Sequence, residues 1–337
     1  MLAKHFYAIV QSEENTVDFL KERGLIETDT PPCVHCGSQT KFYTRKERGK
    51  ERTVIRCTKK GCQRTTSVRK GNTFFTYNDK NGQCNSGLSL SQILELSYYW
   101  CFEIPQSTII KLTGRGNHTV TDWMNLCRDI PIAAFEKRSK MGGINTIIQV
   151  DESLMRGKRK YNRGRLLGAD IATENVDVDE LSDEEEPDFN NRNYGKKLTG
   201  PWVFGMCQKD ENGVIDARYF IVEKRDRQTL HKIIQNEIEV GTEIHSDEWL
   251  AYKTIENKGY IHKTVNHSQF FVDPTSGAHT QRIESLWGSL KLRIIKKMHG
   301  TSPSLLPSYL AEQWWRLKNK NDNTFDCFLR DVKLYCT

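Results

Sequence analysis

Three acidic residues stand where a sheet and a helix could bring their carboxylates together. Asp151 ends the apolar segment INTIIQVD, Asp247 ends EIHSD, and Glu284 lies in HTQRIESLWGSLK, which has helical spacing. Two strand-end aspartates and a helical glutamate suit a two-metal phosphoryl-transfer site, whose ions lie about 4 Å apart and share the first aspartate. Such oxygen ligands favour Mg²⁺ or Mn²⁺. Each acid alone is also consistent with an ordinary solvated position, so the prediction depends on all three.

Neighbouring residues complicate the choice of ligands. Glu152 and Glu248 directly follow the two aspartates. Side chains alternate between the faces of a strand, so only one acid of each pair can face a given site. On the helix, Glu284 shares one face with Trp287 and Lys291. The alternative for this stretch is a glutamate–lysine surface helix.

Four cysteines form a second set with ligand spacing. CVHC supplies Cys33 and Cys36, and CTKKGC, which begins after twenty further residues, supplies Cys57 and Cys62. Two close pairs of thiolates are typical of a structural zinc site, and the segment between them has the pattern of a β-hairpin. The sequence therefore predicts a zinc ribbon whose zinc, with four protein ligands, has no open position for chemistry. Four free or buried thiols are the alternative.

Helical spacing recurs in residues 88–131. PQSTIIKLTG and HTVTDWMNLCRDI are joined by the turn GRGN, and we expect the last helix to stop at Pro131. A short helix, a glycine turn and a second helix indicate a helix-turn-helix, and a plain three-helix bundle is the alternative. The residues expected to contact DNA are His118, Thr119, Thr121 and Asp122 at base edges and Arg115 and Arg128 at phosphates.

Composition favours a nucleic-acid partner. The 337 residues carry a net charge of +7 although nine acids crowd into residues 174–188, so the rest of the chain is strongly basic. A basic run follows Asp151 and suits a DNA-binding strip, with a solvated loop as the alternative. That run contains Lys158, Arg159, Lys160, Arg163 and Arg165.

The chain is expected to be a multidomain α+β protein. No apolar run approaches the roughly 18–20 residues of a membrane span, and the start is too short and polar for a secretory signal. We therefore expect an intracellular protein. The predicted parts are a helical segment (1–29), a zinc ribbon (30–77), a helix-turn-helix DNA-binding module (88–131) and a mixed α/β catalytic domain (144–337) with an acidic insertion at about 170–198.

Taken together, these motifs resemble the Merlin-type DDE transposases, eukaryotic relatives of bacterial insertion-sequence transposases. The likeness covers nearly the whole chain, including the ribbon and the helical module, but not the acidic insertion. It rests on the ordered motifs VDE (150–152), SDEWLAY (246–252), VNHSQFFVDP (265–274), HTQRIESLWGSLK (279–291) and SPSLLPSYLAEQWWR (302–316). The resemblance implies an RNase H-like catalytic fold with Asp151, Asp247 and Glu284 as ligands of two Mg²⁺ or Mn²⁺ ions.

The resemblance also implies cut-and-paste DNA transposition. Water would cleave a phosphodiester at the end of an element bounded by terminal inverted repeats, and the freed 3′-hydroxyl would then attack target DNA. Lys291 would contact a phosphate near the cleaved bond. His267 and His279 would position substrate or be structural, and Trp287 would pack the helix on the sheet or stack on DNA.

Assembly and location follow from the same likeness. Both element ends must be handled together, so we expect a homodimer or a larger synaptic oligomer. A nuclear location is expected, or a cytoplasmic one if the source is bacterial. Two other functions stay open: a domesticated DNA-binding protein without catalysis, and a non-mobile RNase H-like nuclease.

Overall fold

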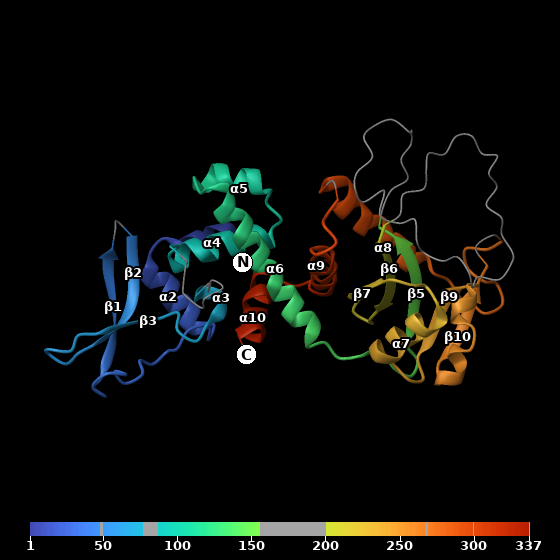
Figure 1. Cartoon of the computed structure of the whole chain (residues 1–337), viewed down its shortest axis with the longest axis horizontal. Helices are drawn as coiled ribbons and strands as arrows, with labels where there is room; N and C mark the ends of the chain where they lie inside the picture. Colours follow the sequence, from blue (N-terminus) through green and yellow to red (C-terminus); the bar gives the residue numbers. More distant parts are fainter. Residues whose placement is uncertain (48–49, 77–86, 156–199, 267–268, 299, 337) are drawn as a thin grey trace. The chain divides into compact units, whose positions relative to one another are not determined.

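The computed structural model describes residues 1–47, 50–76, 87–155, 200–266, 269–298 and 300–336 (Figure 1). The chain divides into two compact units, one formed by Met1–Arg138 with Trp315–Thr337 and the other by Ser139–Trp314. Each unit combines helices with strands, so the fold is mixed α+β. The domain boundaries given above stay predictions; by its contacts, the tail from Trp315 belongs to the first unit. Within the described ranges, no helix is long and apolar enough to cross a membrane.

The first unit is a helical bundle with a small sheet. Aromatic rings fill its core: Phe6 stacks on Tyr98 with ring centroids 4.0 Å apart, and Phe74 meets Phe328 edge-on at 5.6 Å. Its helices are α1 (Ala3–Val10), α2 (Glu13–Glu22), α3 (Thr73–Thr76), α4 (Leu90–Cys101), α5 (Gln106–Thr113), α6 (Asn117–Glu136) and α10 (Thr324–Cys336). The antiparallel sheet has the order β1–β2–β3, formed by Thr40–Glu47, Lys50–Cys57 and Thr65–Ser67.

Helix α6 corrects one expectation from the sequence. It does not stop at Pro131 but continues through this proline to Glu136. Proline inside a helix removes one backbone hydrogen bond and costs about 3 kcal/mol. Pro131 is buried, as are Cys127 and Ile130, and α6 packs along α4 and α10. Burial of this face offsets the cost of the proline, which the local sequence cannot reveal.

The second unit is built on a five-stranded sheet with the order β10–β9–β5–β6–β7. Strands β5, β6 and β7 are antiparallel to one another, whereas β9 runs parallel to β5 and β10 parallel to β9. The strands are β5 (Ile147–Leu154), β6 (Trp202–Lys209), β7 (Ile215–Val222), β9 (Glu243–Asp247) and β10 (Ile261–Val265). A parallel two-stranded sheet, β4 (Met141–Gly142) with β8 (Ile238–Glu239), completes the strands described.

Helices cover both faces of the large sheet. One face forms an apolar core in which Val150 and Phe204 join Leu230 of α7 (Arg227–Glu237). The other face carries α8 (Gln281–Lys291), whose side chains pack on β5 and β6. The remaining segments are the 3₁₀ turns η2 (Leu250–Tyr252) and η3 (Ile255–Lys258), the π-helical η4 (Leu292–Lys297) and α9 (Leu306–Lys318). The last residues of α9, from Trp315, belong to the first unit. Consecutive residues of β5 therefore face different helices.

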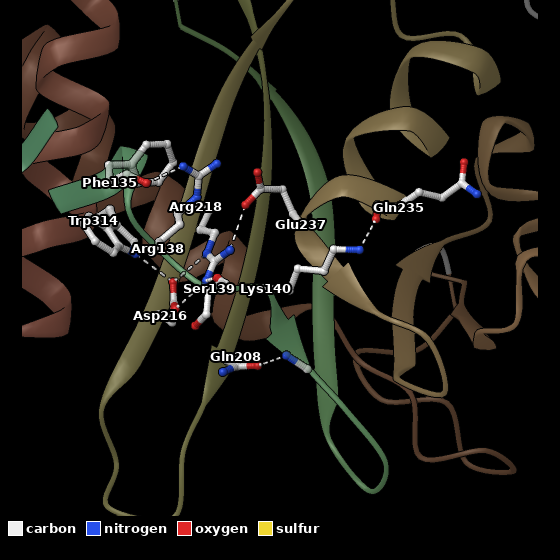
Figure 2. Close-up of polar contacts among 11 residues, drawn as sticks. Phe135, Arg138, Ser139, Lys140, Gln208, Asp216, Arg218, Gln235, Glu237 and Trp314 are labelled. Carbon is white, nitrogen blue, oxygen red and sulfur yellow. Dashed lines mark hydrogen bonds and ion pairs between the residues drawn. The ribbon is translucent and has the colours of Figure 1, made fainter. Parts of the chain in front are cut away.

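A buried ionic network marks the place where the chain enters and leaves this unit (Figure 2). Arg218 on β7 is 1% exposed and pairs with Asp216 at 3.1 Å and with Glu237 of α7 at 2.8 Å. The same guanidinium donates to the carbonyl of Ser139, the first residue of the unit. Trp314, the last residue, donates its indole N–H to Asp216 at 2.8 Å. The network thus fastens both ends of the unit to β7.

Candidate active site and metal centres

Asp151 lies on the α8 face of strand β5. It pairs across the sheet with Gly205 of β6, and its Oδ2 accepts the indole N–H of Trp287 from α8 at 2.9 Å. Its Oδ1 also accepts the backbone N–H of Glu152 at 2.8 Å. These two donors hold the carboxylate between the sheet and the helix.

Asp247 is brought to the same face by the parallel pairing of β9 with β5. The register aligns Gln149 with His245, so the residues two positions further on return to the same face: Asp247 at the end of β9 and Asp151 within β5, which continues to Leu154. Oδ1 of Asp247 accepts the backbone N–H of Trp249 at 3.1 Å. The two aspartates are therefore neighbours on adjacent strands.

Glu284 lies in the first turn of α8. Gln149 fixes the start of this helix, because its buried Oε1 accepts the backbone N–H groups of Arg282 at 2.9 Å and Ile283 at 3.2 Å. The Glu284 carboxylate accepts the hydroxyl of Thr280 at 2.7 Å. One turn further along, Trp287 reaches Asp151, so the face of α8 that carries Glu284 lies over the aspartates.

Asp151 lies in the electrostatic field of the other two acids. Burial, together with the negative charges of Asp247 and Glu284, raises the pKa of Asp151 from near 4 to about 6, although the hydrogen bonds from Glu152 and Trp287 oppose the rise. Burial lowers the pKa of Lys291, while the Asp151 charge acts in the opposite direction. Desolvated like charges are unfavourable without a counter-ion. The site therefore favours a cation beside Asp151.

Glu152 occupies the opposite face of β5. Its carboxylate accepts the hydroxyl of Tyr252, which is fully buried in the apolar core beneath α7. Burial raises the pKa of Glu152 to about 7. Of the Asp151–Glu152 pair, Asp151 is thus the residue that faces Glu284.

A family comparison matches this part of the chain. The model of the ISXO2-like transposase domain, a DDE transposase domain, matches residues 144–318, which is more than half of the chain. The chain belongs to this family. No curated protein matches it.

The donor set of the transposase domain fits the divalent ions that the DDE family implies. Carboxylate oxygens are the ligands that Mg²⁺ and Mn²⁺ prefer. Asp151, Asp247 and Glu284 could hold such ions, which would stabilise the charge of a phosphoryl transfer. Within the described residues, the four cysteines form the only group of three or more side chains already drawn together around a single position.

Trp287 and His279, two further predicted residues of this domain, make structural contacts between α8, its preceding loop and the sheet. Trp287 is 5% exposed and packs its ring against Tyr219, with centroids 5.3 Å apart, so it joins helix to sheet. Nδ1 of His279 lies 2.9 Å from the side-chain nitrogen of Gln149, and its backbone N–H donates to His245. Burial lowers the pKa of His279. His279 thus sits at the base of the loop that leads into α8.

Two residues that matter to the transposase site were not singled out from the sequence. Gln149, buried at 1% exposure, docks α8 on β5. Gly205 leaves room for Trp287, because a Cβ there would lie 2.6 Å from the indole ring. A buried glutamine two residues before Asp151 in an apolar strand is a usable signal, since a buried amide must find partners. The glycine gives no local signal.

The four cysteines of the first unit form a compact cluster. All their sulfur atoms lie within 4.8 Å of one another, with Cys33–Cys62 at 3.8 Å and Cys36–Cys57 at 3.5 Å. Thiolates around a tetrahedral zinc with bonds of about 2.3 Å are separated by about 3.8 Å. Gly37, with φ +67°, closes the first turn by donating to the carbonyl of Cys33. The cluster could therefore hold zinc.

The predicted DNA contacts of the helical module differ in accessibility. Gly114, with φ +63°, ends α5, and α6 begins at Asn117. Near that start His118 is exposed, and Thr119 and Thr121 are partly exposed. Arg115 pairs with Glu95 at 2.9 Å, and Arg128 is 6% exposed and donates to Asn125. These three residues and Asp122, which is also exposed, are the predicted contacts available at the surface.

Several predicted residues lie outside the described part of the chain. They are His267, the basic run Lys158, Arg159, Lys160, Arg163 and Arg165, and the acidic insertion at about 170–198.

Proposed function

We propose that this protein is a DNA transposase that cleaves DNA at the ends of its element and joins the freed 3′-hydroxyl to target DNA. The observation that supports the proposal is that Asp151 and Asp247 face the same side of adjacent strands beneath the helix of Glu284, where burial and the charges of the other two acids raise the pKa of Asp151. Membership of a DDE transposase family supports the same reaction class.

Different residues of the proposed site would bind the metal ions, hold helix α8 and bind the DNA phosphate. Two divalent ions, when bound, would activate the attacking oxygen and stabilise the leaving oxygen of an in-line displacement. Asp151, Asp247 and Glu284 would hold these ions. The hydrogen bonds of Gln149 with the start of α8 and of Trp287 with Asp151 fasten α8 to strand β5. This docking would hold Glu284 near the two aspartates. Lys291, on the same helix face and within the field of Asp151, would bind the phosphate beside the cleaved bond.

The strand order supports an RNase H-like domain. Three antiparallel strands, β7, β6 and β5, are followed by the parallel β9 and β10, and the acids stand on the first strand of the domain, β5, on its parallel neighbour β9 and on a later helix. The motifs around VDE and SDEWLAY are those of the Merlin-type likeness.

The first unit would recognise the terminal inverted repeats. A zinc ribbon built on the four-cysteine cluster and a helix-turn-helix built on α5 and α6 would act together. His118, Thr119 and Thr121 stand at the amino end of α6, where side chains of a recognition helix reach base edges. We propose a homodimer or larger synaptic assembly, working in the nucleus of a eukaryotic source or the cytoplasm of a bacterial one.

The test uses a donor plasmid that carries the DNA flanking the gene on both sides, with Mn²⁺ and a target plasmid. Wild type and Glu248→Gln, an exposed acid beside Asp247, should both cleave and join. Glu284→Gln keeps the acceptor for Thr280 but should lose both steps. Cleavage without joining would instead indicate a non-mobile nuclease. Binding without any cleavage by wild type would indicate a domesticated DNA-binding protein.

Crystals soaked in Mn²⁺ test the metal site without knowledge of the DNA ends. Anomalous density among the three carboxylates is expected in wild type and should be lost in Asp151→Asn. Density elsewhere, with none at these acids, would contradict the catalytic proposal.

A further inference from the structure

Three consecutive apolar side chains are exposed on the loop that precedes α8. Phe270 is 43% exposed, Phe271 77% and Val272 44%. Single exposed apolar residues are ordinary, but a run that includes two aromatic rings marks an interaction site more often than a packing defect.

Both ends of this loop are fixed beside the catalytic acids. On one side, β10 ends at Val265, which pairs with Asp247. On the other side, the backbone N–H of His279 donates to Nδ1 of His245, two residues before Asp247. The loop therefore rises from the edge of the sheet at which Asp247 stands, and then continues into the helix of Glu284.

The segment after the apolar run is a tightly bonded turn. Oδ1 of Asp273 accepts the backbone N–H groups of Ser276 at 2.6 Å and Thr275 at 3.1 Å, and Gly277 donates back to the carbonyl of Asp273 at 2.9 Å. Ala278, at 0% exposure, anchors the turn on the body of the unit. The chain thus buries a residue six positions after Val272 and still leaves the aromatic rings in solvent.

We propose that Phe270, Phe271 and Val272 form a stacking surface for a nucleobase next to the scissile phosphate. This inference rests on the proposed transposase function, because that function brings a DNA end to Asp247. Phosphate binding calls for cations, whereas an exposed aromatic ring offers a face to an unstacked base, and apolar side chains open base steps by inserting between them.

The size of the surface favours a base over a protein partner. A stable protein interface buries about 800 Å² on each partner, supplied by some 20–30 residues. Three side chains are far short of this, so the surface suits a partner as small as one or two bases. The surface would hold the terminal base out of the duplex while the 3′-hydroxyl is aligned for joining.

The experiment measures binding of two short duplexes of arbitrary sequence in Ca²⁺, each with 2-aminopurine at the end. In one duplex the terminal two positions are unpaired, and in the other they are paired. Wild type should quench the 2-aminopurine of the unpaired duplex. Phe271→Ala should reduce this quenching and weaken binding of the unpaired duplex about five- to tenfold, with little change for the paired one.

Two further variants make the result specific. Phe271→Tyr keeps an aromatic face and should retain quenching. Ile144→Ala removes another exposed apolar side chain (81% exposed) just before β5 and should behave as wild type. Equal binding and quenching by Phe271→Ala and wild type would overturn the inference. So would a change of oligomeric state in Phe271→Ala with unchanged DNA binding, which would indicate a protein contact.

Failure of the parent proposal would look different. If wild type cleaves its own element ends but Phe271→Ala is unaltered in every DNA measurement, only the stacking inference fails. If wild type shows no Mn²⁺-dependent cleavage at all, the transposase proposal fails first.

Discussion

At the residue scale, the partly buried charge of Asp151 links stability to metal binding. Its folded-state pKa of about 6 lies above the usual value near 4, so between these pH values the folded protein binds a proton that the unfolded chain does not. The contribution of this group to the free energy of unfolding therefore falls as pH rises through about 4 to 6. At neutral pH, the metal-free protein carries an unfavourable charge.

Asp151→Asn removes that charge and keeps an oxygen for the Trp287 N–H. In the absence of metal at pH 7.5, we expect the variant to be more stable than wild type by on the order of 1–3 kcal/mol. The difference should shrink as pH falls below about 6, because wild type then becomes protonated. Thermal unfolding with and without Mn²⁺ measures this, and the variant should lose the Mn²⁺-induced rise in Tm. A variant less stable than wild type at pH 7.5 would contradict the account.

Gly205 supplies a second prediction at this scale. A Cβ at Gly205, on strand β6, would lie 2.6 Å from the Trp287 ring. A Cβ at Gly288, which follows Trp287 in helix α8, would meet nothing within 4 Å. We expect Gly205→Ala to displace Trp287 from Asp151, to lower stability by about 1–3 kcal/mol and to weaken Mn²⁺ binding. Gly288→Ala should be neutral or stabilising, since alanine favours helix by up to about 1 kcal/mol. Denaturant unfolding and Mn²⁺ titration distinguish the two, and equal behaviour would count against the role of Gly205.

The sequence predicts these residues unevenly, for a physical reason. Strand alternation correctly predicted that Asp151 and Glu152 do not face the same site. This prediction succeeds because the direction of a side chain on a strand depends only on its position in that strand. Gln149 and Gly205 act through partners more than 80 residues away in the chain, as Gln149 does with Ile283. Such pairings depend on the completed sheet, so the spacing of nearby residues does not report them.

At the element scale, features set by the local sequence can again be predicted, whereas features set by distant partners cannot. The turn between helices α5 and α6 is of the first kind, and the ionic network on β7 is of the second. Gly114 correctly predicted the end of α5. Pro131 wrongly predicted the end of α6, because the sequence does not show that α6 packs against α10. Arg218 on β7 looks in the sequence like one more surface cation. Its burial follows from carboxylates contributed by another element and by its own strand.

Replacement of Arg218 by Met should therefore destabilise the second unit strongly. It would leave the buried Asp216 and the partly buried Glu237 without their cation, a change that costs about 3–5 kcal/mol. The matched control is Lys209→Met on the adjacent strand β6, where the side chain is exposed and the expected change lies within about 0.5 kcal/mol. Chemical denaturation of the full chain measures both variants. A small effect of Arg218→Met would show that the network does not fasten the ends of this unit.

At the scale of the whole molecule, the two predicted metal systems belong to different units. The cysteine cluster lies in Met1–Arg138 and the three acids lie in Ser139–Trp314. Their ligands also differ in kind, since thiolates select zinc and carboxylates select Mg²⁺ or Mn²⁺. Removal of zinc should therefore impair recognition of DNA, and removal of Mg²⁺ or Mn²⁺ should impair the chemistry on DNA.

Cys57→Ser tests this separation. Loss of one of four thiolates should release zinc, unfold the turn regions around the ribbon and reduce binding to the element's inverted repeats at least tenfold. The Mn²⁺-induced rise in Tm of the second unit should remain, because no ligand there has changed. Cys336→Ser, a thiol of the same unit outside the cluster, should keep both properties. Zinc content, repeat binding and Mn²⁺ response are measured on the same preparations. If Cys57→Ser abolished the Mn²⁺ response as well, the two sites would be one cooperative system, and the ribbon would support catalysis as well as recognition.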